Sequence, residues 1–363
     1  MAPLGNLVRL LPLHINELPA HPALDSLLQN ATSNEISNGN SNGHINGTTP
    51  SQAGQIASVE RPNLISFMEE VLDQATIFVD DTLPATFKKC GLKTSKPSTG
   101  KVELLKRMVS PAEIKAVPWI NSSIPRNWSA NRNKKPGEAW FARRSRHANH
   151  SSEGTADLDE FDYGLRYNHS KHEQEYTPDV FDSYKVFDWS EQIQTAIGKG
   201  PGIDNYRELD MSIYEMGHQL PAMLSNRVFP VLVLTAKRGR HSFVVVQIPI
   251  DIRDLTSAFY SNRRNLKEGS SSVKRQKSVL GIYTSIESCR ILPDQNIEWV
   301  MATASDAKGW LPMWMQKMGV PSAVVKDVGL FIQYVQKRRP FFRKMPLGTS
   351  SEADDGAKVG SRG

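Results

Sequence analysis

The stretch IEWVMATASDAKG, residues 297–309, joins two parts of the chain that differ in hydrophobic pattern, and it decides the fold. Its first nine residues are typical of a β-strand, and Asp306-Ala307-Lys308-Gly309 then changes the period. Beyond it, apolar residues recur at i, i+4, i+7 and i+11, which predicts an amphipathic helix. Lys337-Arg338-Arg339 and then Pro340 are signals for the end of that helix. The apolar positions are Val324, Val328, Phe331 and Val335.

Five successive β-rich runs precede this helix, with turn residues at Pro221, Gly239 and Pro293-Asp294. Runs in this order predict an antiparallel meander. A curved antiparallel sheet has an apolar face to cover, and one long amphipathic helix can cover it. We therefore expect an α+β protein with the helix-grip fold, in which a curved antiparallel β-sheet wraps around a long C-terminal α-helix. The runs are 210–219, 227–237, 242–252, 279–292 and 297–305.

The chain upstream of the meander has a more mixed pattern. Residues 63–79 have apolar side chains at helical spacing and predict an amphipathic helix. Residues 90–135 show little periodicity and are interpreted as a long loop, whereas 138–147 predict a strand. Helical spacing returns over 157–176, with Thr155 or Asp157 as the expected cap.

Composition divides the chain into four parts. Residues 30–59 contain six Asn, four Gly, five Ser and three Thr, so 18 of 30 positions have almost nothing to bury. The predicted organisation is a short N-terminal helical segment that can dock on the main domain, a disordered linker, one ligand-binding domain and a disordered tail. Their ranges are 1–29, 30–60, 61–340 and 341–363.

Composition also excludes several classes of protein. No apolar run reaches the roughly 18 residues that span a bilayer, so we do not expect a transmembrane protein. Two cysteines cannot form a disulfide framework, and the start of the chain lacks a targeting signal, so we expect a cytoplasmic protein. The formal charge of +6, from 44 basic and 38 acidic residues, does not argue for a nucleic-acid partner.

Two motifs in the C-terminal half resemble those of START lipid-transfer domains. Ser225-Asn226-Arg227-Val228-Phe229 resembles the Ser-x-Arg-Asp-Phe element, with Val228 in place of the usual Asp. The segment from Asp306 to Trp314, DAKGWLPMW, resembles the Asp-x-Lys-Gly-x-Ile-Pro-x-Trp link between the last strand and the covering helix. Three upstream motifs are similar to a fungal START-like family of unknown function: GEAWFAR at 137–143, EQEYTPDV at 173–180 and YEMGHQLP at 214–221.

The resemblance implies a helix-grip fold with an internal hydrophobic cavity for one ligand, often a sterol or a phospholipid. It also implies a function without catalysis: binding the ligand and transferring it between membranes. The changed residue at Val228 leaves the details of the tunnel open, and the family does not specify the ligand.

A lipid tunnel needs apolar walls and a few polar groups. Gln247, within an otherwise apolar run, is a candidate polar anchor, and a solvent-facing position is the alternative. Glu215 and Arg290 could point inward as a pair, or they could be two separate surface charges. His218 and Tyr283 are weaker candidates of the same kind. From the covering helix come Met313, Trp314, Met318 and Phe331, which ordinary core packing explains equally well.

Basic residues form two clusters that could contact an anionic membrane. Solvated loop charges are the alternative. The expected partners are therefore a hydrophobic small molecule and, peripherally, a membrane surface. The candidate membrane contacts are Arg263, Arg264, Lys274, Arg275, Lys277, Lys337, Arg338 and Arg339.

Signatures of enzymes and of metal or cofactor sites are weak. His169-Ser170-Lys171-His172-Glu173 does not match the His-Glu-x-x-His zinc helix, and Gly198-Lys199-Gly200-Pro201-Gly202 lacks the spacing of a phosphate loop. We expect no catalytic residues, no metal and no cofactor. Two alternatives stay open: an enzyme that acts on a hydrophobic molecule in the same cavity, and a regulatory interaction module controlled by phosphorylation near Ser270-Ser271-Ser272. Gly319-Val320-Pro321 interrupts the last helix and could let its front section swing as a gate, with a simple kink as the alternative.

Overall fold

A computed structural model of the protein describes residues 5–24, 61–117, 137–199, 203, 205–220, 224–306 and 313–342. Within these ranges the side chains of 199, 313–320 and 342 are not described. The predicted linker at 30–60 lies outside the described residues, as does the predicted tail from 343 onward.

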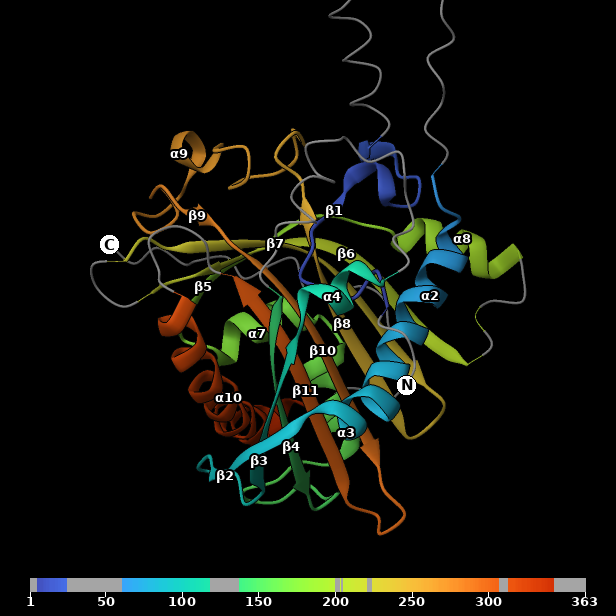
Figure 1. Cartoon of the computed structure of the whole chain (residues 1–363), viewed down its shortest axis with the longest axis vertical. Coiled ribbons are helices and arrows are strands. Elements are labelled where there is room, and N and C mark those ends of the chain that lie inside the picture. The colour runs from blue at the N-terminus through green and yellow to red at the C-terminus, as the bar shows by residue number, and fades with distance from the viewer. Residues whose placement is uncertain are drawn as a thin grey trace, which may run out of the picture.

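The described elements are a large antiparallel sheet and helices on both of its sides (Figure 1). This confirms the predicted α+β class and the helix-grip arrangement. The strands are β1 (Leu13–His14), β2 (Lys88–Thr94), β3 (Lys101–Val109), β4 (Glu138–His147), β5 (Val180–Asp188), β6 (Tyr206–His218), β7 (Arg227–Arg238), β8 (Ser242–Asp251), β9 (Val279–Leu280), β10 (Ile282–Ile291) and β11 (Ile297–Asp306). The helices are η1 (Ile15–Glu17), α2 (Leu64–Ile77), η2 (Phe78–Thr82), α3 (Leu83–Thr86), α4 (Pro111–Lys115), α6 (Leu158–Phe161), η3 (Asp162–Arg166), α7 (His169–Tyr176), α8 (Ser190–Lys199), α9 (Asn265–Glu268) and α10 (Met313–Phe342).

The strand order along the sheet is β2-β3-β4-β11-β10-β8-β7-β6-β5. Neighbours on this path are all antiparallel, and β5 to β8, β10 and β11 follow one another in chain order, so the predicted meander is confirmed. The short strands β1 and β9 pair in parallel with β8 and β7. The antiparallel pairing of β4 with β11 joins the N-terminal hairpin region to the meander, and nothing in the local sequence predicts it.

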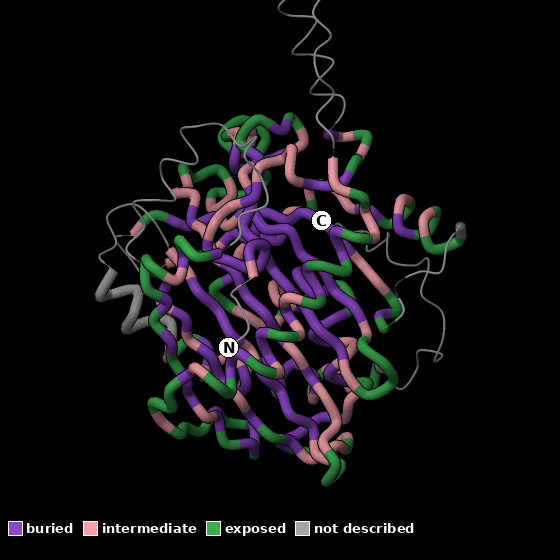
Figure 2. Tube along the Cα trace, turned by 45° about the vertical axis from the view of Figure 1, so that its right-hand side comes forward, coloured by how far each residue is buried: buried purple, intermediate pink, exposed green. Residues whose placement is uncertain are grey.

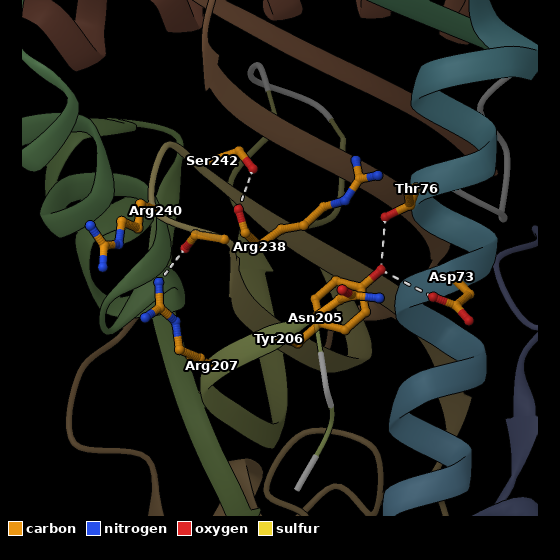
Figure 3. Close-up of a pocket in the computed structure, with 9 residues that line it drawn as sticks. Asp73, Thr76, Asn205, Tyr206, Arg207, Arg238, Arg240 and Ser242 are labelled. Atoms are coloured by element: carbon orange, nitrogen blue, oxygen red, sulfur yellow. Dashed lines mark hydrogen bonds between the residues drawn. The ribbon is translucent and has the colours of Figure 1, made fainter.

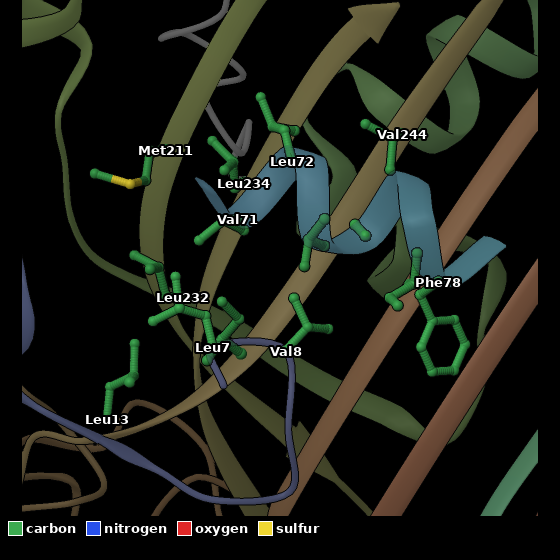
Figure 4. Packing of buried hydrophobic residues seen from close by; sticks show 14 of the residues in the cluster. Leu7, Val8, Leu13, Val71, Leu72, Phe78, Met211, Leu232, Leu234 and Val244 are labelled. Carbon is green, nitrogen blue, oxygen red and sulfur yellow. The ribbon is translucent and has the colours of Figure 1, made fainter. Parts of the chain in front are cut away.

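We call the side of the sheet that α2 covers the outer face. Successive residues of a strand point to opposite faces, so Val244 and Val246 of β8 pack on the outer side while Phe243 and Val245 pack on the other. Figure 4 shows outer-face side chains of β6, β7 and β8 meeting those of α2 and of the N-terminal segment.

The helix predicted at 63–79 is confirmed as α2. Asn63 caps its start, because the side chain accepts a hydrogen bond from the backbone N–H of Ser66. Its buried stripe consists of Phe67, Met68, Val71, Leu72 and Ala75. Burial of one such large side chain is worth about 2 kcal/mol relative to exposure, so the stripe fixes α2 against the sheet.

The N-terminal segment differs from the predicted helix. Its described part is helical only over η1 and residues 22–24, and β1 runs extended beside β8. The side-chain oxygen of Gln74 accepts hydrogen bonds from the N–H groups of Leu7 at 3.0 Å and Val8 at 3.4 Å. The prolines interrupt the leucine pattern and prevent one continuous helix, yet five of the described leucines are buried, so the expected docking does occur.

Two other predictions need correction. Residues 90–135 are not one loop, because most of β2, all of β3 and α4 lie within this range and the described part ends at 117. β2 lies at the edge of the sheet, and all of its residues except Gly91 are exposed. Its sequence therefore lacks the alternation of polar and apolar residues that predicts a strand. The helical pattern of 157–176 begins at the predicted cap Asp157, but it is divided at Asn168, which adopts a left-handed conformation with φ 46°.

We call the side of the sheet that α10 covers the inner face, and α6, η3 and α7 also lie there. The predicted apolar positions of the last helix, from Val324 to Val335, are at most 3% exposed. Gly164 of η3 lets this layer approach α10 closely, because a Cβ on it would lie 2.6 Å from the ring of Phe331. The helix is assigned continuously through Pro321 and Pro340, so it passes the predicted stop by two residues. Figure 2 shows the resulting burial, with buried residues along the strands and exposed ones in the connections.

Candidate functional site

Polar and ionisable side chains gather on the inner face, between the sheet and the two helices α7 and α10. We call this set the inner polar cluster. It interrupts an otherwise apolar layer that contains Phe161, Phe331 and Val328. The members are Arg143 of β4, His169 and Glu173 of α7, Gln247 of β8, Ser285 and Glu287 of β10, and Asp327 of α10.

A buried ion pair forms one end of the inner polar cluster. Nη2 of Arg143 lies 3.0 Å from Oε1 of Glu287, and these side chains are 2% and 8% exposed. Trp299 of β11, the strand between β4 and β10, completes the group: its indole N–H donates to the same Glu287 oxygen at 2.7 Å, and its ring lies 3.8 Å below the guanidinium carbon. Two donors therefore converge on one oxygen of Glu287.

A hydrogen-bond chain forms the other end. The Ser285 hydroxyl donates to Oε1 of Gln247 at 2.9 Å, and the Gln247 amide lies 2.8 Å from Nε2 of His169. Nδ1 of His169 lies 2.5 Å from the Leu165 carbonyl, which can only accept. We therefore assign the proton of a neutral His169 to Nδ1, so that Nε2 accepts from Gln247.

Two acids face this site without a strong cationic partner. Burial raises the pKa of Glu173, His169 acts to lower it, and the charge of Glu287 raises it again. Burial raises the pKa of Asp327 to about 7, against the lowering influence of Arg143. Nε2 of His169 lies 3.7 Å from Oε2 of Glu173, which is too far for a hydrogen bond. Both acids thus favour the protonated form at neutral pH more than an ordinary carboxyl does.

Several polar atoms of this region have no hydrogen-bond partner among the described residues. They are buried atoms of three side chains: Nε and Nη1 of Arg143, Oε2 of Glu173 and the hydroxyl of Tyr283. Buried polar groups are nearly always hydrogen-bonded, to protein, water or a ligand. The inner polar cluster therefore has both donors and an acceptor available for another molecule.

Four of the predicted ligand-binding residues lie on the inner side of the sheet. Gln247 belongs to the inner polar cluster, Phe331 packs in the apolar layer around it, and Tyr283 has a ring 5.3 Å from that of Phe229. His218 stacks edge-on against Phe229 at 5.2 Å, and burial lowers its pKa to about 4. Their role in binding a ligand stays a prediction.

The predicted Glu215–Arg290 pair is wrong, because both residues belong to the outer-face pattern of their strands. Glu215 accepts hydrogen bonds from the backbone N–H groups of residues 259–261, at 2.6, 3.0 and 2.6 Å. Arg290 is 42% exposed and binds Asp80 at 2.9 Å and Glu298 at 2.7 Å. The faces were assigned from strand alternation, which does not tell which face α10 covers.

The other predicted helix residues, Met313, Trp314 and Met318, lie outside the described side chains. The motif residues 307–312 and the segment 200–202 also lie outside the described residues. Gly319 and Val320, of the proposed gate, have described backbone but no described side chains.

The basic residues divide into engaged and exposed ones. Lys274 binds Asp182 at 2.9 Å, Arg264 donates to the Tyr184 hydroxyl at 2.6 Å, and Arg275 donates to the Gly269 carbonyl. In α10, Arg338 binds Glu175 at 2.7 Å and Arg339 binds Glu160 at 2.6 Å. The exposed ones are Arg263, Lys277 and Lys337, for which the described residues show no ion pair.

An open pocket of about 630 Å³ on the outer side is a second candidate (Figure 3). Its polar groups largely satisfy one another: the Tyr206 hydroxyl lies 3.0 Å from Oγ1 of Thr76 and donates to Asp73 at 3.2 Å, and Arg207 donates to the Gly239 carbonyl at 2.6 Å. It lacks the apolar walls that a hydrophobic ligand needs, so we do not assign the ligand to it.

Sequence reasoning missed the charged members of the inner polar cluster: Arg143, Glu173, Glu287 and Asp327. One signal was present. Arg143 and Arg144 are consecutive in a predicted strand, so one of them must face inward if helices cover both sides of the sheet. The pairing of β4 with β11, which brings Arg143 within reach of Glu287, is not visible in the sequence.

Within the described residues, no group of three or more His, Cys, Asp or Glu side chains is placed to hold a metal ion. His169 and His172, which the sequence analysis did not assign to a metal site, face the carbonyls of Leu165 and Tyr163. The described helices include none with the length and apolar character needed to cross a membrane.

The chain is similar to several known proteins. Solved structures similar to it include human STARD10, with 9% identity, a TM-score of 0.42 and coverage of 72% of this chain and 79% of that one. Human StAR-related lipid transfer protein 5 is another, with 13% identity, a TM-score of 0.43 and coverage of 77% and 97%. A curated relative, the uncharacterized protein C577.11 of Schizosaccharomyces pombe, is 24% identical over 209 residues, which cover 56% of this chain and 71% of that protein.

The predicted similarity to START domains is found among solved structures, and the predicted similarity to a family of unknown function is found by a family model. A family model described as "Protein of unknown function (DUF3074)" matches residues 140–335. That match begins in β4, ends in α10 and includes every member of the inner polar cluster. Because it spans more than half of the chain, the chain belongs to the DUF3074 family.

Proposed function

We propose that the chain binds one hydrophobic molecule, of the lipid class, between the inner face of the sheet and α10, and that it does so without catalysis. The observation that carries this proposal is the inner polar cluster, in which buried donors and an acceptor lack partners within an apolar layer. Sites for hydrophobic ligands combine apolar walls with a few polar groups in this way.

The exposure of the side chains around the cluster supports an internal space. The Glu173 side chain is 21% exposed, yet burial is the main cause of its raised pKa. Tyr176, Tyr283 and Asp327 show the same combination of partial exposure and a pKa raised by burial. Side chains that border a space inside the protein, rather than bulk water, have both properties.

We also propose that the chain transfers its ligand between membranes. The connection from β8 to β10 carries Arg263 and Lys277, and an exposed Leu266 between them is 43% accessible. Lys337 and Phe341, which is 66% exposed, lie near the end of α10. Apolar side chains flanked by basic ones suit a transient contact with an anionic membrane.

The test is native mass spectrometry of the purified full chain, followed by organic extraction and identification of what is released. We expect one lipid per chain in a stoichiometric complex. An empty protein that also takes up neither fluorescent sterol nor fluorescent phospholipid would overturn the proposal. It would favour the interaction-module alternative.

One observation favours the enzymatic alternative as a second candidate. Acids with raised pKa values inside a site, here Glu173 and Asp327, are typical of general acid–base chemistry as well as of ligand binding. Incubation of the protein with the extracted lipid distinguishes the two. An unchanged lipid supports binding, and a product that disappears in Glu173→Gln would support catalysis.

A further inference from the structure

The inner polar cluster contains more acids than bases. Glu173, Glu287 and Asp327 come from three different elements, and Arg143 is the one guanidinium among the described residues of the cluster. All four groups interact with Tyr176, so they share one region. Charge in such a region must be balanced locally, because water does not screen it.

The charge of Arg143 is already balanced. Its Nη2 lies 3.0 Å from Glu287, and its guanidinium stacks on Trp299. The other groups that face the two remaining acids offer no free cation. Both ring nitrogens of His169 are engaged, by the Leu165 carbonyl and the Gln247 amide, Gln247 and Ser285 are uncharged, and the neighbouring Lys326 of α10 is an exposed side chain. An additional anion would therefore meet Glu173 and Asp327 without a free countercharge.

We propose that the inner polar cluster selects ligands whose polar end is an uncharged hydroxyl-type group and rejects ligands with an anionic end group such as a carboxylate or a phosphate. This inference rests on the proposed function and names the chemistry of its ligand. A hydroxyl donates one hydrogen bond and accepts others. It can therefore satisfy the free Oε2 of Glu173 and accept from Nη1 of Arg143 or from the Tyr283 hydroxyl, which are the atoms left without partners among the described residues.

A hydroxyl and an anionic oxygen differ in which polar atoms of the inner polar cluster they can satisfy. An anionic oxygen only accepts hydrogen bonds, so it cannot satisfy the ionised form of Glu173, and the ionised forms of Glu173 and Asp327 repel it. Replacement of both acids by their amides removes this repulsion and supplies N–H donors. The double variant Glu173→Gln, Asp327→Asn should therefore tolerate an anion.

The experiment compares three twelve-carbon probes that differ only in their end group: 1-dodecanol, dodecanoate and dodecylamine. Binding to the full chain is measured by titration calorimetry at pH 7.5, below the concentration at which the probes aggregate. We expect 1-dodecanol to bind at least about tenfold tighter than dodecanoate, and the double variant to reduce this ratio to about threefold or less. Glu175→Gln, which removes a more exposed acid of the same helix, should keep the ratio of the unmodified protein.

Dodecanoate that binds as tightly as 1-dodecanol would overturn the inference, as would dodecylamine binding tightest of the three. The end group of the lipid that co-purifies is an independent readout, and a phosphate or carboxylate there would also overturn it. Each of these three results would leave the proposed function intact. If no probe binds and no lipid co-purifies, the proposed function itself fails, and the inference fails with it.

Discussion

Arg143 and Glu287 are 144 residues apart in the chain, and their side chains are joined at 3.0 Å across the intervening strand β11. The Trp299 ring lies beneath the guanidinium, and its indole N–H donates to the same carboxylate. Three strands thus contribute to one buried group. This group links the N-terminal strands to the meander at the point where we place the ligand.

Removal of one partner from this pair should be costly. Glu287→Ala leaves Arg143 charged, buried and unpaired, which typically costs 3–5 kcal/mol. Chemical denaturation at neutral pH measures the loss. Lys89→Ala, which breaks the exposed pair with Glu103, is the matched control and should cost at most about 1 kcal/mol. Equal losses in the two variants would contradict a buried pair.

Asp327 should reduce stability at alkaline pH. Its pKa rises from 3.8 to about 7 in the folded protein, so the folded state holds its proton more tightly than the unfolded state does. This acid therefore subtracts stability as pH rises from 4 to 7, and the loss is complete above 7. Asp327→Asn should be more stable than the unmodified protein by about 2–4 kcal/mol at pH 8, with no gain at pH 4. Urea unfolding at both pH values measures this, and Asp81→Asn, an exposed acid, should show no such trend.

His147 should act in the opposite direction. Burial, with a smaller contribution from Arg143, lowers its pKa from 6.5 to about 4, so the folded protein keeps it neutral. The unfolded chain takes up this proton below pH 6.5, and stability is lost as pH falls from 6.5 to 4. In His147→Gln the slope of the unfolding free energy over this window should be flatter by up to about 1.4 kcal/mol per pH unit. The exposed His241, changed to Gln, is the control, and an unchanged slope in His147→Gln would contradict the burial of a neutral ring.

Glu215 should fasten the connection between β8 and β10. It is fully buried, and its carboxylate accepts three backbone N–H groups of residues 259–261. Glu215→Gln replaces one accepting oxygen by an NH₂ group that cannot accept. Hydrogen bonds to a charged group are worth about 1.5–3 kcal/mol, so amide exchange at these residues should accelerate by about tenfold or more. Hydrogen-exchange mass spectrometry measures this. Glu268→Gln, in the same connection, should leave the exchange unchanged.

Exposed basic residues should carry the membrane contact. Arg263, Lys277 and Lys337 are changed together to Ala, and binding to vesicles that contain phosphatidylserine is measured by co-sedimentation. Each residue near an anionic surface contributes about 1 kcal/mol, so we expect a loss of affinity of tenfold or more at low salt. A second triple variant at Lys88, Lys89 and Lys93 of β2 removes the same charge elsewhere. Equal losses in both triple variants would show a general charge effect and contradict a specific contact.

Periodicity predicted much of the fold. It located α2, β4 and the five β-rich runs of the meander, and it placed the buried stripe of the last helix on Val324, Val328, Phe331 and Val335. These elements have strong periods of 2 or 3.6 residues. β2 was missed because an edge strand with mostly exposed positions does not need to alternate. The N-terminal segment is only partly helical where it is described, because prolines interrupt it and β1 is extended.

For the candidate site, Gln247, Tyr283 and Phe331 were placed on strands and a helix that do face one another, whereas Glu215 and Arg290 lie on the other side of the sheet. Alternation divides the residues of one strand into two sets, one for each face of the sheet. Because helices cover both faces, both sets are apolar, and the sequence does not tell which set faces α10. Only contacts with α7 and α10 separate the inner set from the outer one.

The sequence by itself determined the class of the fold, because an antiparallel meander followed by one amphipathic helix has an apolar face that this helix must cover. It also determined membership of a family, through local motifs that need no partner. The tertiary structure alone decided which charges meet. Arg143, Glu173, Glu287 and Asp327 come from β4, α7, β10 and α10, and their proximity depends on the long-range pairing of β4 with β11 and on the packing of helices over the sheet. Those relationships arise from burial summed over many residues, so no short stretch of sequence records them.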